Sequence, residues 1–252
     1  MNLNRILVII PCFNEVRAIG SLLEEMRSSF PACDVLVIDD GSTDGTMAEA
    51  IKHTRVVRLP VNLGIGGAVQ TGILFAKAGG YDFCIQVDGD GQHPPTEIKR
   101  LIDCRIQNPD ASLIIGSRYL ERSGFQSTRM RRFGISIISV ILRIISRVQI
   151  LDPTSGFRLI DRRCIEVFSN DYPSDFPEPV SIAIAAAHNL KVCETAVVMR
   201  ERSHGVSSIT GLKPLFYMLR VCCQILFVRL RETWLTGTSR RAKLVEGNCN
   251  DS

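Results

Sequence analysis

An alternation of short apolar runs with helical stretches fills the first half of the chain and decides its fold class. Five runs rich in Val, Ile and Leu are separated by stretches with helical periodicity. Strands joined by helices in this way form a parallel sheet with helices on both faces, so we predict an α/β protein. The runs are Arg5–Ile10, Asp34–Ile38, Arg55–Leu59, Asp82–Val87 and Ala111–Gly116, and the helices are Val16–Ser28, Asp44–His53, Gly66–Ala78 and Pro95–Gln107.

Acidic and polar residues follow three of these runs, at the points where the predicted strands end. The segments are Pro11-Cys12-Phe13-Asn14-Glu15, Asp39-Asp40-Gly41-Ser42-Thr43-Asp44-Gly45-Thr46 and Asp88-Gly89-Asp90-Gly91-Gln92. Ligands of parallel sheets bind beyond the carboxyl ends of the strands, so we expect the three segments to converge. Carboxylates so close together repel one another, and a divalent cation with a sugar or ribose would compensate them.

The Asp-x-Asp pair is the candidate metal site. Asp88 and Asp90 alternate along an extended segment, and Gln92 follows two residues later, so two carboxylates and an amide oxygen share one side. The alternative is a surface turn rich in Asp and Gly. A buried-looking strand before the pair and a helix opened by two prolines after it favour the metal. We expect His93 and His204 to be hydrogen-bonding loop residues rather than ligands.

Two adjacent carboxylates, Asp39 and Asp40, end the second predicted strand. A turn needs only one such residue, so we expect this pair to hydrogen-bond a base or ribose. Asp44 instead suits the cap of the next helix. Glycines near residue 64, Gly66 among them, would let a phosphate-bearing ligand approach, and a simple turn explains them equally well. Their spacing does not match the dinucleotide-binding fingerprint.

Six motifs in order resemble those of family 2 glycosyltransferases with the GT-A fold, in particular the dolichol- or polyprenyl-phosphate mannosyltransferase branch. The resemblance extends from about Arg5 to about Ile209. It implies a nucleotide-diphospho-sugar transferase fold with a mostly parallel central sheet, and an inverting, metal-dependent sugar transfer. The motifs are the three strand-end segments, Asn62-Leu63-Gly64, Gly116-Ser117-Arg118-Tyr119 and Asp152-Pro153-Thr154-Ser155-Gly156-Phe157-Arg158.

The resemblance also implies which residues bind the donor. The nucleotide sugar would meet Pro11, Phe13, Asn14, Glu15, Asp39, Asp40, Asp88, Asp90, Arg202 and Ser207, and Gly66 and Gly89 complete the expected set. Mg2+ or Mn2+ would be held by Asp88, Asp90 and Gln92. Arg202 belongs to a late loop that closes over the donor phosphates, and its planar cation suits phosphate oxygens. That loop departs from the mannosyltransferase pattern because Ser208 replaces a lysine.

The sequence leaves two classes of acceptor open, a lipid phosphate and a saccharide hydroxyl. In the related branch an arginine that matches Arg118 faces the acceptor phosphate, and Arg131 or Arg132 would help to position it. We expect a polyprenyl phosphate, which is an anion at neutral pH and needs no strong base. A saccharide hydroxyl, the alternative, would need a carboxylate base such as Glu178 or Asp152. A non-catalytic nucleotide-binding partner of a membrane protein is a third alternative, which the intact acidic motifs argue against.

The expected catalytic residues are Asp90, Arg118, Arg202 and Glu178. Glu178 lies in Pro177-Glu178-Pro179-Val180, which resembles a P-E-P-E element of bacterial family members. Val180 replaces the second acid, so Glu178 is the one carboxylate of that element.

Net charge and cysteine content limit the kinds of binding partner and the cellular compartment that we expect. The formal net charge of +4 is far from that of a nucleic-acid-binding protein. Nine cysteines without a C-x-x-C pair suit reduced thiols, and the first residues resemble neither a signal peptide nor a spanning helix. We therefore expect a cytoplasmic protein, with a homo-oligomer left open.

Two amphipathic stretches, Arg132–Arg147 and Leu212–Glu232, have a wide apolar face beside basic residues. We expect them to attach the protein peripherally to the inner face of the cell membrane, or to a small integral membrane protein. Burial in the core or in a dimer is the alternative. The predicted organisation is a catalytic domain over 1–210, a C-terminal amphipathic helical appendage over 211–235 and a disordered tail over 236–252.

Overall fold

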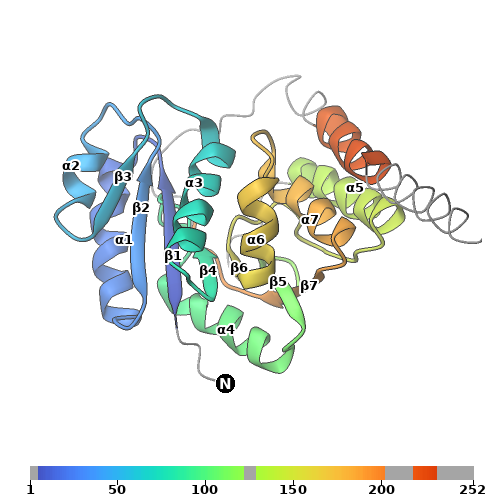
Figure 1. Ribbon diagram of the computed structural model, residues 1–252, viewed down its shortest axis with the longest axis horizontal. Helices are drawn as coiled ribbons and strands as arrows, with labels where there is room; N and C mark the ends of the chain where they lie inside the picture. The colour runs from blue at the N-terminus through green and yellow to red at the C-terminus, as the bar shows by residue number, and fades with distance from the viewer. Residues whose placement is uncertain (1–4, 122–128, 202–217, 232–252) are drawn as a thin grey trace, which may run out of the picture.

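A seven-stranded sheet forms the centre of the computed structural model, which describes residues 5–121, 129–201 and 218–231. The strand order is β3-β2-β1-β4-β6-β5-β7 (Figure 1). Only β6, between β4 and β5, runs antiparallel to its neighbours. The predicted mostly parallel sheet is confirmed. The strands are β1 (Ile6–Cys12), β2 (Asp34–Asp39), β3 (Arg55–Arg58), β4 (Phe83–Gln86), β5 (Ala111–Ser117), β6 (Arg158–Asp161) and β7 (Lys191–Ala196).

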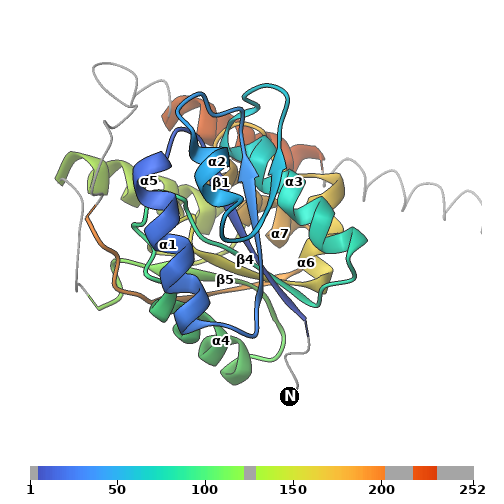
Figure 2. The same cartoon turned by 90° about the vertical axis from the view of Figure 1, so that its left-hand side faces the viewer.

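Helices cover both faces of the sheet, each over its own apolar core. The side chains of β1 alternate between the two cores, with Ile6, Val8 and Ile10 toward α1 and α4, and Leu7 and Ile9 toward α3 and α6. Figure 2 shows these two pairs of helices on opposite sides of the sheet. The helices are α1 (Val16–Ser29), α2 (Thr46–Ala50), α3 (Gly64–Ala78), α4 (Ile98–Gln107, after a 3-10 turn at Pro95–Glu97), α5 (Arg129–Ile145), α6 (Arg162–Asn170) and α7 (Pro177–Ala187). This arrangement confirms the predicted α/β class.

The second half of the chain contains helices and strands that the sequence pattern did not predict. The motif that begins at Asp152 leads directly into β6, and the proline-containing segment Tyr172–Pro179 contains the start of α7. Pro177 occupies the first turn of that helix, where its missing N–H costs nothing, and Phe176 before it adopts a left-handed conformation. A sequence rich in proline therefore begins a helix here instead of excluding one.

Two helices, α5 and the helical residues 218–231, lie at the outer side of the core that contains Leu7 and Ile9 (Figure 1). They touch where a side chain on Gly134 would meet Met218 Sδ at 3.5 Å. Within the three described ranges, no helix combines the length and apolarity needed to cross a bilayer. The expected appendage over 211–235 is described only at 218–231, and the expected tail over 236–252 lies outside the described residues.

Candidate active site

The ends of β1, β2 and β4 bring the three acidic segments to one edge of the sheet. Cys12 pairs with Asp39 across β1 and β2, and the Gly89 amide donates to the Pro11 carbonyl at 3.3 Å. The buried Cys12 thiol lies near these carboxylates. Its pKa is raised well above the usual value, first by burial and then by the charges of Glu15, Asp39, Asp88 and Asp90. The predicted convergence of the carboxylates is confirmed.

The loops after β1 and β2 are cross-linked through side chains. The Asn14 amide donates to Ser42 Oγ at 2.9 Å, and Asn14 Oδ1 accepts from the Thr43 amide at 2.9 Å. Asp44 accepts hydrogen bonds from the amides of Val16 and Thr46, the first residues of α1 and α2. The cap position of α2 is occupied by Gly45, in a left-handed conformation, and not by Asp44 as expected. Glu15 follows the same loop, and Phe13 is half exposed at its rim. These contacts hold the first two acidic segments in a fixed relation.

Asp39 and Asp40 have different surroundings although they are adjacent. Asp40 accepts from the Leu63 amide at 2.7 Å, and burial raises its pKa. The fully buried Asp39 accepts from the Ser42 amide through Oδ1, but its Oδ2 has no hydrogen-bond donor among the described residues. Arg58 Nε is 3.6 Å from that oxygen, beyond hydrogen-bond distance. A buried carboxylate oxygen without a donor is costly, and a ligand that supplies one would relieve it.

Two glycines of the expected donor set are required by packing against the protein itself. A Cβ on Gly66 would come within 2.3 Å of the Ser174 carbonyl oxygen, so α3 approaches the segment before α7 closely. A Cβ on Gly89 would lie 2.4 Å from Cys12 Sγ. The second contact keeps the loop after β4 against the end of β1.

The loop after β4 carries the Asp-x-Asp pair. Asp88 Oδ1 accepts from Gln86 Nε2 at 3.1 Å, and Asp90 accepts from both the backbone and the side-chain amide of Gln92. Gln92 therefore presents its amide nitrogen to Asp90. Among the described residues, no three His, Cys, Asp or Glu side chains are grouped closely enough to hold an ion. Carboxylates such as those of Asp88 and Asp90 are the ligand type that hard divalent cations prefer.

The neighbouring His93 is a structural residue of this loop, as expected. It is buried, its Nδ1 accepts from the Asp88 amide at 3.0 Å, and its ring stacks on Phe157 at 5.0 Å. The motif between Asp152 and Phe157 is thereby held against the acidic loop. A Cβ on Gly156 would lie 2.9 Å from Asp88 Oδ1.

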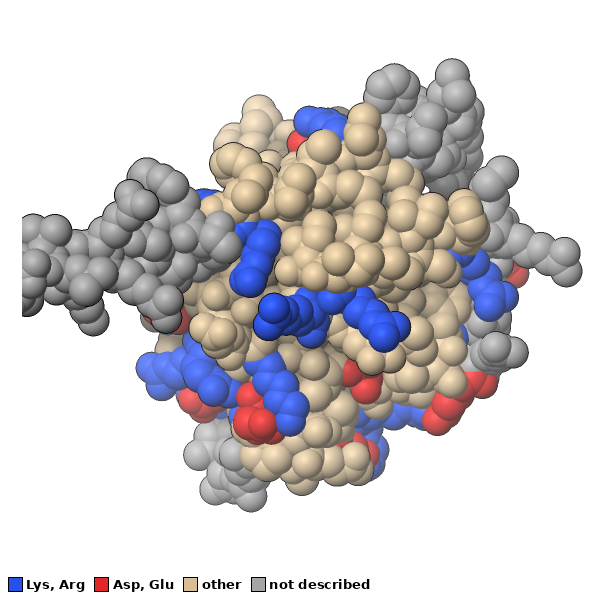
Figure 3. Space-filling view, turned by 90° about the vertical axis from the view of Figure 1, so that its right-hand side faces the viewer, with Lys and Arg blue, Asp and Glu red and all other residues tan. Residues whose placement is uncertain are grey.

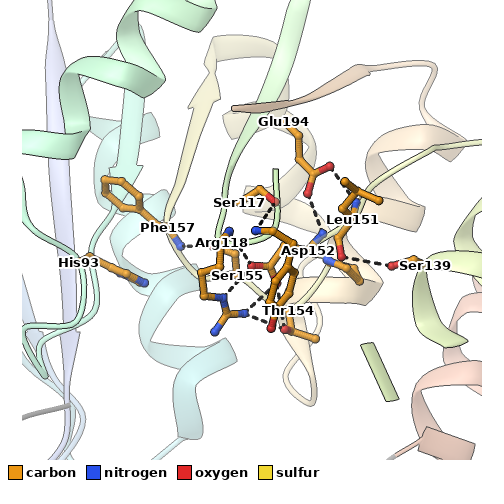
Figure 4. Close-up of polar contacts among 12 residues, drawn as sticks. His93, Ser117, Arg118, Ser139, Leu151, Asp152, Thr154, Ser155, Phe157 and Glu194 are labelled. Carbon is orange, nitrogen blue, oxygen red and sulfur yellow. Dashed lines mark hydrogen bonds and ion pairs between the residues drawn. The ribbon is translucent and has the colours of Figure 1, made fainter. Parts of the chain in front are cut away.

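A buried ion pair joins this motif to the end of β5 (Figure 4). Arg118 donates from Nε and Nη2 to the two carboxylate oxygens of Asp152, each at 2.7 Å, and from its backbone amide at 3.2 Å. Asp152 is fully buried and Arg118 is 6% exposed. The pKa of Arg118 is raised: burial opposes the charge, and the hydrogen bonds and charge of Asp152 outweigh it. Arg118 is thus fixed in place, and Asp152 is its counter-ion.

The remaining predicted residues are placed as follows. Arg132 Cζ and Arg118 Cζ lie 5.7 and 5.4 Å from the centre of the Tyr119 ring, so the ring stands beside both arginines. Glu178 lies in the first turn of α7, near enough for its charge to raise the pKa of Arg158, whose net pKa is lowered by burial. The side chain of Arg131, and all of Arg202, His204, Ser207 and Ser208, lie outside the described residues.

Glu194 is a site residue that the sequence did not indicate. It lies on β7 and accepts from the amides of Leu151 and Asp152 at 2.7 and 2.6 Å (Figure 4). Burial is the main cause of its raised pKa. A carboxylate in the middle of Val192-Cys193-Glu194-Thr195-Ala196 is the signal that could have found it, because an acid in a half-buried strand needs donors.

Comparison with known proteins decides the family. Residues 7–168, well over half of the chain, match the family model described as Glycosyl transferase family 2. The chain belongs to this family. It is a glycosyltransferase of the GT-A fold, as its motifs predicted.

Relatives and a solved structure agree with this membership. The glycosyltransferase is 30% identical to the polyprenol monophosphomannose synthase of Mycolicibacterium smegmatis, over 82% of each chain. It is 29% identical to the undecaprenyl-phosphate mannosyltransferase of Micrococcus luteus, over 82% of this chain and 88% of the relative. Glucosyl-3-phosphoglycerate synthase from Mycobacterium tuberculosis, crystallised with Mn2+, uridine diphosphate and phosphoglyceric acid, has the same fold. Its TM-score is 0.65 at 19% identity, over 89% of this chain and 78% of that one.

Proposed function

We propose that this glycosyltransferase moves a sugar from a nucleotide-diphosphate donor to a polyprenyl phosphate, with inversion at the anomeric carbon. One observation carries the choice of acceptor. Both oxygens of Asp152, and both of Glu194, already accept hydrogen bonds within the protein. The acceptor side of the site thus offers a fixed arginine and occupied carboxylates, which suits an acceptor that is already an anion. The names of the two mannosyltransferase relatives support the same acceptor class.

The donor would lie across the ends of β1, β2 and β4. Asp39, with its unsatisfied oxygen, would accept from the base or the ribose. Asp88 and Asp90 would hold Mg2+ or Mn2+, which offsets the negative charge of the diphosphate. Arg202 is proposed to meet the same phosphates. The solved relative with Mn2+ and uridine diphosphate supports a divalent ion at this type of site.

The chemical step needs no proton transfer from the acceptor. An oxygen of the lipid phosphate attacks the anomeric carbon and forms the new bond. The bond from that carbon to the donor diphosphate breaks on the opposite face, and the leaving diphosphate takes the electron pair. Arg118 would contribute a positive charge near the attacking phosphate, and Arg131 or Arg132 would assist it. The charge of Asp88 acts on Arg118, and this supports an acceptor side next to the acidic loop.

A lipid acceptor requires access to a membrane, and we propose that the outer helices provide it. Residues Phe133, Ile137, Val140 and Ile144 form an exposed stripe on α5, and Leu219, Leu226, Phe227 and Leu230 are exposed on the 218–231 helix. Exposed arginines flank them, among them Arg132, Arg143, Arg147 and Arg229. Figure 3 shows Lys and Arg crossing a broad uncharged surface on this side of the molecule. An apolar face with a basic edge suits the headgroup boundary of an anionic membrane. Peripheral attachment to the inner face of the cell membrane follows from this proposal.

A transfer assay tests the proposal. The purified protein is incubated with labelled nucleotide sugars, Mg2+ or Mn2+, and undecaprenyl phosphate in anionic vesicles, and the organic-extractable label is counted. The expected result is a sugar lipid that forms only with both the metal and the lipid phosphate. The Glu178→Gln variant should retain this transfer, since a phosphate acceptor needs no base.

Two outcomes would refute the proposal. Transfer to a saccharide, lost in Glu178→Gln, would establish the hydroxyl acceptor instead. Nucleotide binding without any turnover, over all donors tested, would support a non-catalytic binding protein.

A further inference from the structure

Glu194 binds the backbone of Leu151 and Asp152, next to the ion pair of Asp152 with Arg118. Its two carboxylate oxygens accept from consecutive amides, Oε2 from Leu151 at 2.7 Å and Oε1 from Asp152 at 2.6 Å. Hydrogen bonds to an ionised carboxylate are stronger than neutral ones. Figure 4 shows the side chain of Glu194 reaching from β7 over the segment that carries Asp152. The backbone at residues 151 and 152 therefore has one position relative to the sheet.

The position of that backbone determines where the arginine is held. Asp152 is fully buried and faces Arg118, which donates to it from the backbone and from two side-chain nitrogens. A movement of the Asp152 backbone would move its carboxylate, and the guanidinium of Arg118 would follow. Arg118 lies within reach of the charge of Asp88, so a small movement changes the distance between the proposed acceptor side and the acidic loop.

Holding the strand in the sheet does not require an acid at this position. The charge of Asp152 opposes that of Glu194, and burial disfavours its ionised form. β7 is already paired with β5 along six residue pairs, from Ala111 with Lys191 to Ser117 with Ala196. A carboxylate kept next to a second carboxylate at such a cost has a use beyond the sheet, which is the fixed backbone of the arginine's counter-ion.

We propose that Glu194 is a positioning residue for acceptor recognition: it fixes the Leu151–Asp152 backbone so that Asp152 holds Arg118 where the acceptor phosphate binds. Glu194 itself does not touch the substrate. The identity of the acceptor rests on the proposed function, whereas the link from Glu194 to Arg118 does not.

The Glu194→Gln variant tests this link with little change of shape. The amide offers one acceptor oxygen, and its NH2 group faces a backbone N–H, so one of the two hydrogen bonds to the Leu151 and Asp152 amides is lost. With the full-length protein, we expect KM for undecaprenyl phosphate to rise about tenfold, while KM for the donor stays within about twofold. Glu166→Gln is the matched control, because Glu166 of α6 makes an exposed ion pair with Lys77 of α3. It should leave both constants unchanged.

A double-mutant cycle separates positioning from a general loss of structure. In an Arg118→Ala background, Glu194→Gln should have no further effect on the acceptor KM, because its effect passes through Arg118. Additive effects, or equal changes of the donor and acceptor KM, would overturn the inference.

A spectroscopic measurement keeps the inference testable if lipid phosphate proves not to be the acceptor. The Nε–H of Arg118 is held in a buried ion pair, so its exchange with solvent is slow. Glu194→Gln should speed this exchange about tenfold in the protein without substrate, and Glu166→Gln should not. Unchanged exchange would refute the role of Glu194 for any acceptor. Faster exchange without lipid transfer by the unmutated protein would refute only the proposed acceptor.

Discussion

The contact between Gly89 and Cys12 predicts how a single methyl group should disturb the donor site. In Gly89→Ala the new Cβ would lie 2.4 Å from Cys12 Sγ and 3.1 Å from the Pro11 carbonyl oxygen. Comfortable contact between such atoms is about 3.5–4.0 Å, so the loop after β4 and the end of β1 must separate by about 1 Å. Cys12 is buried, and close-packed interiors do not yield without cost.

The expected cost follows from this overlap. Overpacking of a close-packed site destabilises by about 1–3 kcal/mol. For a chain of this size, that lowers the melting temperature by about 2–4 °C per kcal/mol. Donor binding should weaken as well, because the same shift moves Asp88 and Asp90 away from Asp39.

The thiol provides an internal control. Cys12→Ala removes Sγ, and the nearest side-chain atom to the new methyl is then the Cβ of residue 12, at 3.4 Å. The double variant should therefore regain about 1–2 kcal/mol relative to the sum of the single effects. The measurements are urea unfolding and calorimetric titration with nucleoside diphosphates. Gly134→Ala on α5 is the matched control, because the nearest described atom to its new Cβ would be Met218 Sδ at 3.5 Å, and it should be neutral or slightly stabilising. A Gly89→Ala protein as stable as wild type, or one that Cys12→Ala fails to relieve, would refute the argument.

Three other substitutions test separate parts of the account. Asp39→Asn should weaken nucleotide binding about tenfold in a calorimetric titration without lowering stability, because it removes a buried charge whose Oδ2 has no hydrogen-bond donor among the described residues; tight binding by the variant would contradict the assignment. Asp152→Asn should cost about 3 kcal/mol, since it leaves the buried Arg118 cation without its counter-ion, and a thermal melt lowered by less than about 2 °C would count against this. Phe227→Asp should reduce sedimentation with anionic vesicles, whereas Ile51→Asp, at an exposed apolar residue beyond α2, should not; equal effects would argue against the proposed membrane face.

The first half of the fold was predictable because local pattern and tertiary structure agree there. Five strands rich in Val, Ile and Leu, separated by periodic helices, admit little besides a parallel sheet, and the segments after them had to converge. The second half depends on pairing that no local pattern records. The four-residue strand β6 begins with Arg158 and ends with Asp161, and it is a strand because it lies between β4 and β5.

The site shows the same limit in its charged residues. The motifs located Arg118 and Asp152, but only the three-dimensional structure pairs them, so that Asp152, a candidate base for a hydroxyl acceptor in the sequence, is the counter-ion of Arg118. Glu194 has no motif around it, and its role follows from two backbone amides that lie 42 and 43 residues away in the sequence. Gly66 and Gly89 were expected at the donor site, and the close approach that each permits in the structure is to the protein's own atoms.

Calorimetric titration of the unmutated protein with UDP and GDP, in Mn2+ and in excess chelator, tests most directly whether the acidic edge forms a donor site. We predict one binding site per chain that is filled by one of these nucleotides in Mn2+, and lost both in chelator and in the Asp90→Ala variant. Equal affinity with and without the metal, or undiminished binding by Asp90→Ala, would contradict the account.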